Sequence, residues 1–250
     1  MEKCWANSLG DCDGKISREH TVSESLFKGT YVDVKGFSWC KSEEKRIGLG
    51  SLTKKILCEK HNSALSPLDA AASHAFDVLR KQTKLSNDRG KNPNKKYKKV
   101  TFSINSTFLE RWLLKTLINF SYDGDYFIGP NSTIKGRPCE TLVNIAYGKK
   151  RFKDENGMYV AYKKGGEINS TDTVAFSPII KDDKYVYGGK FIFRGVLLFL
   201  DISPDGIKVP FKDMPGSDPE WHDVYLSKRF KQIKATHGNK ISHVVNFNWA

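Results

Sequence analysis

Residues 57–62 read Leu57-Cys58-Glu59-Lys60-His61-Asn62, and this stretch decides how the N-terminal part of the chain folds. It holds a Cys-x-x-His pair just before a helical pattern over residues 66–80, in which Ser66 fits an N-cap and Pro67 the first helical position. A pair of this kind at a helix start is a common half of a zinc knuckle, because both side chains point back at one metal. We therefore predict that Cys58 and His61 are zinc ligands.

A second pair of candidate ligands lies near the start of the chain. Cys4 and Cys12 are eight positions apart, with Gly10 and Asp11 in a turn between them. Together the two pairs offer three sulfurs and one nitrogen, the donor set of a closed tetrahedral structural zinc site. Cys40 lies between the pairs and is an alternative to Cys12, but we expect it to be a free thiol in a small apolar patch.

The dipeptide Glu19-His20 falls between the two ligand pairs, in an expected short strand after the Asp13-Gly14 turn. The order is thus cysteine pair, acid-His, Cys-x-x-His-Asn, helix. This order resembles the HNH endonucleases with a zinc-binding treble-clef frame, over about residues 4–80. The resemblance implies a ββα-metal module over residues 1–80.

The resemblance also implies roles for three residues. His20 matches the general base that activates a water molecule for attack on phosphorus. Glu19 and Asn62 match the protein ligands of one Mg²⁺ or Mn²⁺ ion, while the zinc is structural. These residue types suit the reaction, because a hard cation prefers oxygen ligands and an imidazole of near-neutral pKa can take a proton from water.

One position departs from the family pattern. The family usually has another asparagine nine residues before the metal-ligand position, where this chain has Thr53, with Ser51 close by. In another register Asn62 itself is that middle residue, and the third position falls on Ala71 or is taken by His74. We prefer the first register because the Cys-x-x-His-Asn order fixes it.

The net charge of the 250-residue chain is +13, which favours a polyanionic partner such as nucleic acid. The basic excess is greatest over residues 80–99, which carry nine basic residues and one acid. We interpret residues 81–99 as an exposed loop that grips phosphates, with a plain solubilising linker as the alternative. The candidate phosphate contacts are Arg18, Lys54, Lys55, Lys95, Lys96, Lys98 and Lys99.

Residues 100–250 form the remaining part of the chain. Residues 108–119 show the clearest helical pattern, and β-type segments separated by Gly, Pro, Asn and Asp follow it. These segments are residues 142–147, 158–162, 173–180, 185–187, 190–200 and 243–249. The chain is therefore expected to be α+β: an N-terminal treble-clef module, then an α+β domain with a mainly antiparallel sheet and an unknown task.

The sequence thus predicts a cytoplasmic, metal-dependent endonuclease that hydrolyses phosphodiester bonds in DNA, in preference to RNA, in restriction or phage defence. No apolar run approaches the roughly 18–20 residues of a membrane helix, and the N-terminus has no signal-peptide core. The alternative is a non-catalytic zinc module that binds nucleic acid, and a protein adaptor is a third, weaker reading. A protein partner would then contact residues 100–250.

Overall fold

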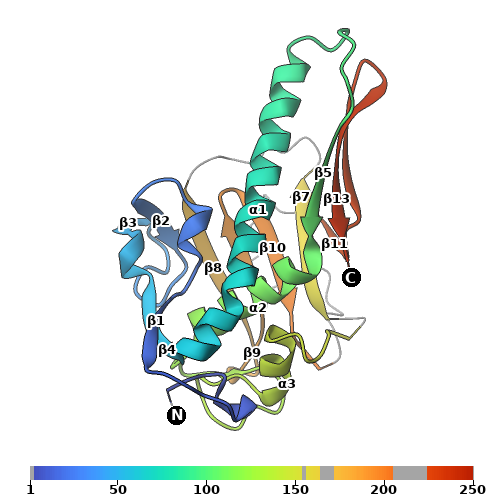
Figure 1. Ribbon diagram of the computed structural model, residues 1–250. Coiled ribbons are helices and arrows are strands. Elements are labelled where there is room, and N and C mark those ends of the chain that lie inside the picture. Colours follow the sequence, from blue (N-terminus) through green and yellow to red (C-terminus); the bar gives the residue numbers. More distant parts are fainter. Residues whose placement is uncertain (1–2, 154–155, 164–171, 205–223, 250) are drawn as a thin grey trace.

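The computed structural model describes residues 3–153, 156–163, 172–204 and 224–249. Over these residues the protein is mixed α+β with mainly antiparallel sheets, which confirms the predicted class (Figure 1). The helices of the described ranges are α1 (Glu59–Gly90), α2 (Ser106–Ser121) and α3 (Glu140–Ala146). Among them there is no helix with the length and apolar character needed to cross a membrane.

The N-terminal unit is a two-stranded antiparallel pair followed by a helix. Strand β1 (Ile16–His20) pairs with β4 (Thr53–Cys58), and α1 starts immediately after β4. The backbone N–H groups of Glu59 and Lys60 donate to the carbonyls of Lys15 and Asp13, so the turn before β1 satisfies the first amides of the helix.

The long helix α1 corrects two expectations from the sequence. It begins seven residues before Ser66 and ends at Gly90, so Ser66 is not its N-cap and Pro67 lies inside it. The Cys-x-x-His turn, not a Ser-Pro signal, starts the helix. Residues 81–90 are helical rather than an exposed loop, because α1 packs along the strand β5 (Val100–Asn105) and against β12 (Gln232–His237) and β13 (Lys240–Asn248).

The main sheet joins the two parts of the sequence. Its order is β11-β7-β10-β9-β8-β2-β3, with β6 beside β9. Strand β2 (Tyr31–Lys35), from the first 80 residues, lies parallel to β8 (Thr173–Lys181). The other strands of this sheet are β3 (Lys45–Gly48), β6 (Phe127–Ile128), β7 (Gly157–Lys163), β9 (Tyr185–Phe193), β10 (Val196–Asp201) and β11 (Val224–Lys228).

Two expected strands differ from the structure. Residues 142–146 lie in α3, which is preceded by Cys139. Tyr147 follows the helix, and Gly148 at φ +74° is the left-handed residue that ends it. Residues 190–200 belong to two strands, because Arg194 and Gly195 both have positive φ and make a tight hairpin turn between β9 and β10. The helix expected at 108–119 is confirmed as α2, whose N-cap Asn105 accepts from the amide of Phe108.

The core lies between α1, α2 and the main sheet. Trp112 of α2 is fully buried and meets Phe76 of α1 and Phe193 of β9 edge-on, at ring-centroid distances of 5.9 and 5.1 Å. Figure 1 shows α1 crossing in front of the sheet, with its C-terminal end projecting beside β5 and β13. The start of α1 and its C-terminal end are therefore at opposite ends of the molecule.

Candidate metal centre and hairpin site

Cys4, Cys12, Cys58 and His61 converge at the start of α1, as the sequence predicted. Their ligand atoms all lie within 4.8 Å of one another. The Nδ1 atom of His61 is 3.3 Å from the Sγ of Cys4, 3.6 Å from that of Cys12 and 3.2 Å from that of Cys58. A tetrahedral zinc ion with ordinary Zn–S and Zn–N bonds places nitrogen and sulfur about 3.6 Å apart. The residues present therefore fit a structural zinc ion.

The other ring nitrogen of His61 fixes its orientation. Nε2 lies 2.9 Å from Oδ1 of Asp11, and the Nζ of Lys60 lies 2.9 Å from Oδ2 of the same carboxylate. Hydrogen bonds from Lys60 and His61 lower the pKa of Asp11 to about 2. An ionised Asp11 holds the proton of His61 on Nε2, which leaves Nδ1 free to bind a metal.

The thiols of the cluster differ in acidity. Burial raises the pKa of Cys4 to about 12 and raises that of Cys12. Burial also acts to raise the pKa of Cys58, but hydrogen bonds at the backbone of His61 and Asp13 and at the neighbouring thiols outweigh it, and the pKa is lowered. Cys58 is therefore the thiol that ionises first, at the helix start, where a metal ion would find its first anionic ligand.

Cys40 and Cys139 lie outside this cluster. The Sγ of Cys40 is buried and points at the carbonyl of Val34, 3.7 Å away, in the apolar surroundings expected for it. Cys139 is a buried free thiol before α3.

His20 stands at the end of β1, opposite Thr53 on β4. Its side chain is 37% exposed, and its Nε2 lies 3.4 Å from Oε2 of Glu24. The Thr53 hydroxyl donates to the carbonyl of Gly50. His20 is thus accessible and has a carboxylate beside it.

Glu19 points the other way. Side chains alternate along a strand, so Glu19 and Ser17 face one side of the hairpin while Arg18 and His20 face the other. Glu19 is only 4% exposed, and its Oε1 is 2.5 Å from the buried ammonium of Lys115 on α2. That ammonium also contacts both carboxylate oxygens of Asp69 at 2.8 Å.

Asn62 contacts the hairpin at Ser17. Its Nδ2 donates to the Ser17 hydroxyl at 3.0 Å. Burial raises the pKa of Glu19, and the neighbouring Lys115 acts to lower it. A charged carboxylate is unfavourable at this buried position, and Lys115 is the cation that compensates it. Of the two residues predicted to hold Mg²⁺ or Mn²⁺, Asn62 is bonded to Ser17, and Glu19 is occupied by Lys115 and does not fit an open metal site.

The candidate phosphate contacts fall into two groups. Lys54 is half-buried, and its Nζ donates to the carbonyls of Asn119, Phe120 and Tyr122 at the end of α2, so it already has partners within the protein. The others have exposed side chains: Arg18, Lys55, Lys95, Lys96, Lys98 and Lys99.

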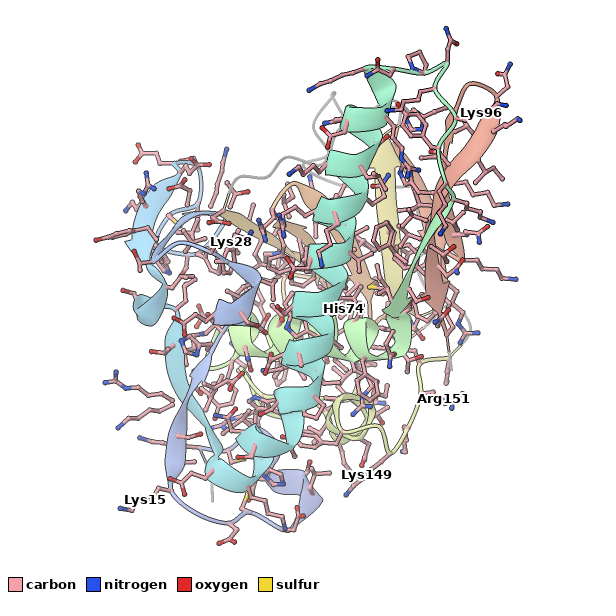
Figure 2. All side chains as sticks on the ribbon, turned by 45° about the horizontal axis from the view of Figure 1, so that its top comes forward. Lys15, Lys28, His74, Lys96, Lys149 and Arg151 are labelled. Atoms are coloured by element: carbon pink, nitrogen blue, oxygen red, sulfur yellow. The ribbon has the colours of Figure 1, made fainter. Side chains whose placement is uncertain are left out.

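The last four of these lysines lie at the far end of α1, where Figure 2 shows Lys96 well away from Lys15 at the helix start. Their segment is held by the buried guanidinium of Arg89, which donates to the carbonyls of Ser242 and Lys98. Residues 91–99 are therefore an ordered turn against the β12–β13 hairpin, with its lysines turned outward.

Sequence reasoning missed three residues that shape these sites. Asp11 was assigned only to a turn, although an acid next to a cysteine ligand is itself a signal of an outer partner. Lys115 and Tyr147, whose hydroxyl donates to the carbonyl of His61, come from helices distant in sequence and leave no local signal. A scan against protein-family models and searches of curated proteins and of solved structures found no match to this chain.

Proposed function

We propose that this protein is a zinc-stapled endonuclease of the HNH type, which hydrolyses phosphodiester bonds with His20 as general base. One observation carries the proposal: the Cys₃His cluster joins the hairpin to α1, and the same hairpin presents the half-exposed His20 beside Glu24. We interpret this arrangement as a treble-clef ββα unit because the order of these residues in the sequence resembles that family.

The pair of His20 and Glu24 suits proton removal from water. A carboxylate 3.4 Å from Nε2 orients the ring and stabilises the imidazolium formed when Nδ1 takes a proton. General-base assistance of this kind contributes typically 10²–10⁴-fold to a rate. Because His20 is exposed, a phosphodiester can approach it without a change in the fold.

A catalytic Mg²⁺ or Mn²⁺ ion would neutralise charge on the phosphate oxygens. Glu19 is already paired with Lys115, and the amide of Asn62 is bonded to Ser17, so neither side chain is free to hold such an ion in this structure. That cleavage requires such an ion stays a prediction, and the experiment below tests it by comparing Mg²⁺, Mn²⁺ and EDTA.

Nucleic acid is proposed as substrate because of charge. The chain carries a net charge of +13, and exposed lysines project from the end of α1 and the turn after it. Each phosphate contact releases condensed counterions, which favours binding irrespective of base sequence. DNA is proposed ahead of RNA through the family resemblance alone.

A second candidate is a zinc-dependent nucleic-acid-binding protein without cleavage. The observation that favours it is the buried ion pair between Glu19 and Lys115, which uses the carboxylate that the HNH pattern assigns to metal. The zinc frame and the basic end of α1 serve binding equally well.

Incubation of the protein with plasmid, single-stranded DNA and RNA, each with Mg²⁺, Mn²⁺ or EDTA, separates the two functions. We expect His20→Ala to lower cleavage about 100-fold or more, in line with the loss of a general base. His74→Ala tests the other register: His74 is an exposed histidine on α1 that contacts the carbonyl of Ser103, and in the preferred register its loss leaves cleavage unchanged (Figure 2). Wild-type protein that binds these substrates and cleaves none of them establishes the second candidate instead.

A further inference from the structure

A cavity of about 700 Å³ lies next to the His20 end of the hairpin. Thr21, the residue after His20, lines it, and so does Thr53, the cross-strand partner of His20. Most of the remaining wall comes from the turn after β2, the end of α2 with the loop that follows, and β8, and β3, β4 and β9 also contribute. Ligand cavities of proteins typically have volumes of about 300–1,000 Å³, so this one is large enough for a small aromatic molecule.

One wall of the cavity is an aromatic platform. The Trp39 side chain is 48% exposed and stacks on Phe37, with ring centroids 5.7 Å apart and planes 19° from parallel. Phe37 in turn meets Phe120 edge-on at 4.9 Å, and Phe176 lies against both of these phenylalanines. An exposed tryptophan braced from behind in this way leaves a flat π-face for a ligand.

The backbone holds this platform in place. Gly36 has φ +90°, and a Cβ there would lie 1.9 Å from the carbonyl oxygen of Phe176, so only glycine fits. The amide of Gly36 donates to the carbonyl of Cys40, and that of Cys40 to the carbonyl of Phe37. The turn that carries Trp39 is thus closed by its own hydrogen bonds.

Most polar side chains of the cavity are hydroxyls and carboxylates. Asp123 and Asp125 have exposed side chains on its wall, with Arg137 3.8 Å from Oδ1 of Asp123, and the buried hydroxyl of Ser121 has no partner among the described residues. The ammonium of Lys54 is directed at backbone carbonyls. Carboxylates repel a phosphate but accept from amino groups, so the chemistry fits a flat, uncharged ring that carries N–H donors.

We propose that this cavity takes an unpaired nucleobase with an exocyclic amino group, from the nucleic-acid strand whose phosphodiester meets His20. The inference rests on the proposed function and narrows it to single-stranded or locally opened substrates. Stacking on an aromatic side chain is tolerant of sequence, and a carboxylate such as that of Asp125 accepts from the amino group of cytosine.

Binding is measured by fluorescence anisotropy with labelled oligo(dC), oligo(dT) and a duplex of equal length. The protein carries His20→Ala and the buffer contains EDTA, so that cleavage plays no part. Adding Trp39→Ala is expected to weaken oligo(dC) binding about 10- to 100-fold, since base stacking is worth about 1–3 kcal/mol per base. Trp39→Phe retains most of the affinity. Tyr31→Ala, at an exposed aromatic outside the cavity, is the control and leaves affinity unchanged.

Three results overturn the proposal: equal affinity of Trp39→Ala and its parent, binding of oligo(dT) as tight as oligo(dC), or free cytidine that binds as tightly as the strand. The acceptor role is checked with Asp125→Asn, which should reduce the preference for oligo(dC). A protein that shows the Trp39 effect but cleaves nothing refutes the nuclease and keeps the cavity. A protein that cleaves but lacks the Trp39 effect refutes the nucleobase site and leaves the proposed nuclease activity standing.

Discussion

Asp11 decides which nitrogen of His61 faces the three thiols. Its carboxylate contacts Nε2 at 2.9 Å, and Nδ1 is thereby left as the donor that points into the cluster. A carboxylate behind a histidine ligand also makes the imidazole a stronger base, which strengthens its bond to a metal.

Asp11→Asn is expected to lower the zinc affinity about 10- to 100-fold, the usual effect of removing an outer partner of a metal-ligating histidine. Competition with a chromophoric chelator measures it, on protein that holds one equivalent of zinc. Asp13→Asn is the control, because Asp13 contacts the amide of Gly14 and not His61. Equal zinc affinity of wild type and Asp11→Asn would show that Asp11 plays no part in holding the metal.

At the scale of elements, the end of α1, the turn over residues 91–99 and the β12–β13 hairpin form one basic projection. Arg89 ties them together through the carbonyls of Ser242 and Lys98, and its guanidinium lies 4.8 Å from the ring centre of Tyr97. The lysines of this projection are therefore held on an ordered surface instead of a free chain.

Neutralising Lys95, Lys96, Lys98 and Lys99 to glutamine should weaken nucleic-acid binding and flatten its salt dependence. Each lost phosphate contact reduces the slope of log K against log salt by about 0.9 on duplex DNA and about 0.7 on single strands. The control neutralises Lys15, Lys28, Lys35 and Lys41, four exposed lysines outside the projection, for the same change in net charge. Identical slopes for both quadruple variants would mean that only total charge matters.

Local patterns predicted some elements and not others. The 3.6-residue spacing of apolar side chains is local, so α2 was predicted within two residues at each end. Ligand spacing likewise identified Cys4, Cys12, Cys58 and His61 as one cluster. The pairing of β2 with β8, by contrast, depends on contacts about 140 residues apart along the chain, as the partner residues Asp33 and Thr173 show.

The same limit applies to the hairpin site. That Glu19 is adjacent to His20 is visible in the sequence, but its partner Lys115 is a lysine in an apolar helix, which reads as a surface residue. The ion pair of Glu19 and Lys115 depends on tertiary packing between distant parts of the chain, which a short stretch of sequence does not show. Glu19, predicted to be a metal ligand, is therefore half of a buried ion pair.

At the scale of the whole molecule, Lys115 connects three elements. From α2 it contacts Glu19 on β1 and Asp69 on α1, and Asp69 also accepts from the hydroxyl of Ser23, which accepts from the indole of Trp112. This buried polar network joins the part of the chain that carries the Cys₃His cluster to the helix that packs on the main sheet.

Lys115→Met should lower the free energy of unfolding by about 3–5 kcal/mol at pH 7, because it leaves buried carboxylate charge without a partner. Burial already raises the pKa of Glu19 above its ordinary 4.5, and loss of the ammonium raises it further. The folded variant then binds a proton more tightly than the unfolded chain, so its defect should shrink as the pH falls towards 4. Urea denaturation at both pH values measures this.

Lys55→Met, at an exposed lysine on β4, is the control and should stay within about 0.5 kcal/mol of wild type. A Lys115→Met protein as stable as that control at pH 7 would show that the network contributes nothing.

The length of α1 sets a spacing for anything that lies along it. Ser23 and Ser25 contact Asp69 and Ser73 of α1, and Glu24 between them is the residue whose carboxylate lies 3.4 Å from His20. From Ser73 to Gly90 the helix rises about 25 Å at 1.5 Å per residue. Under the proposed function the helix would act as a molecular ruler: a strand whose phosphates contact the basic end of α1 would extend about 25 Å to reach His20.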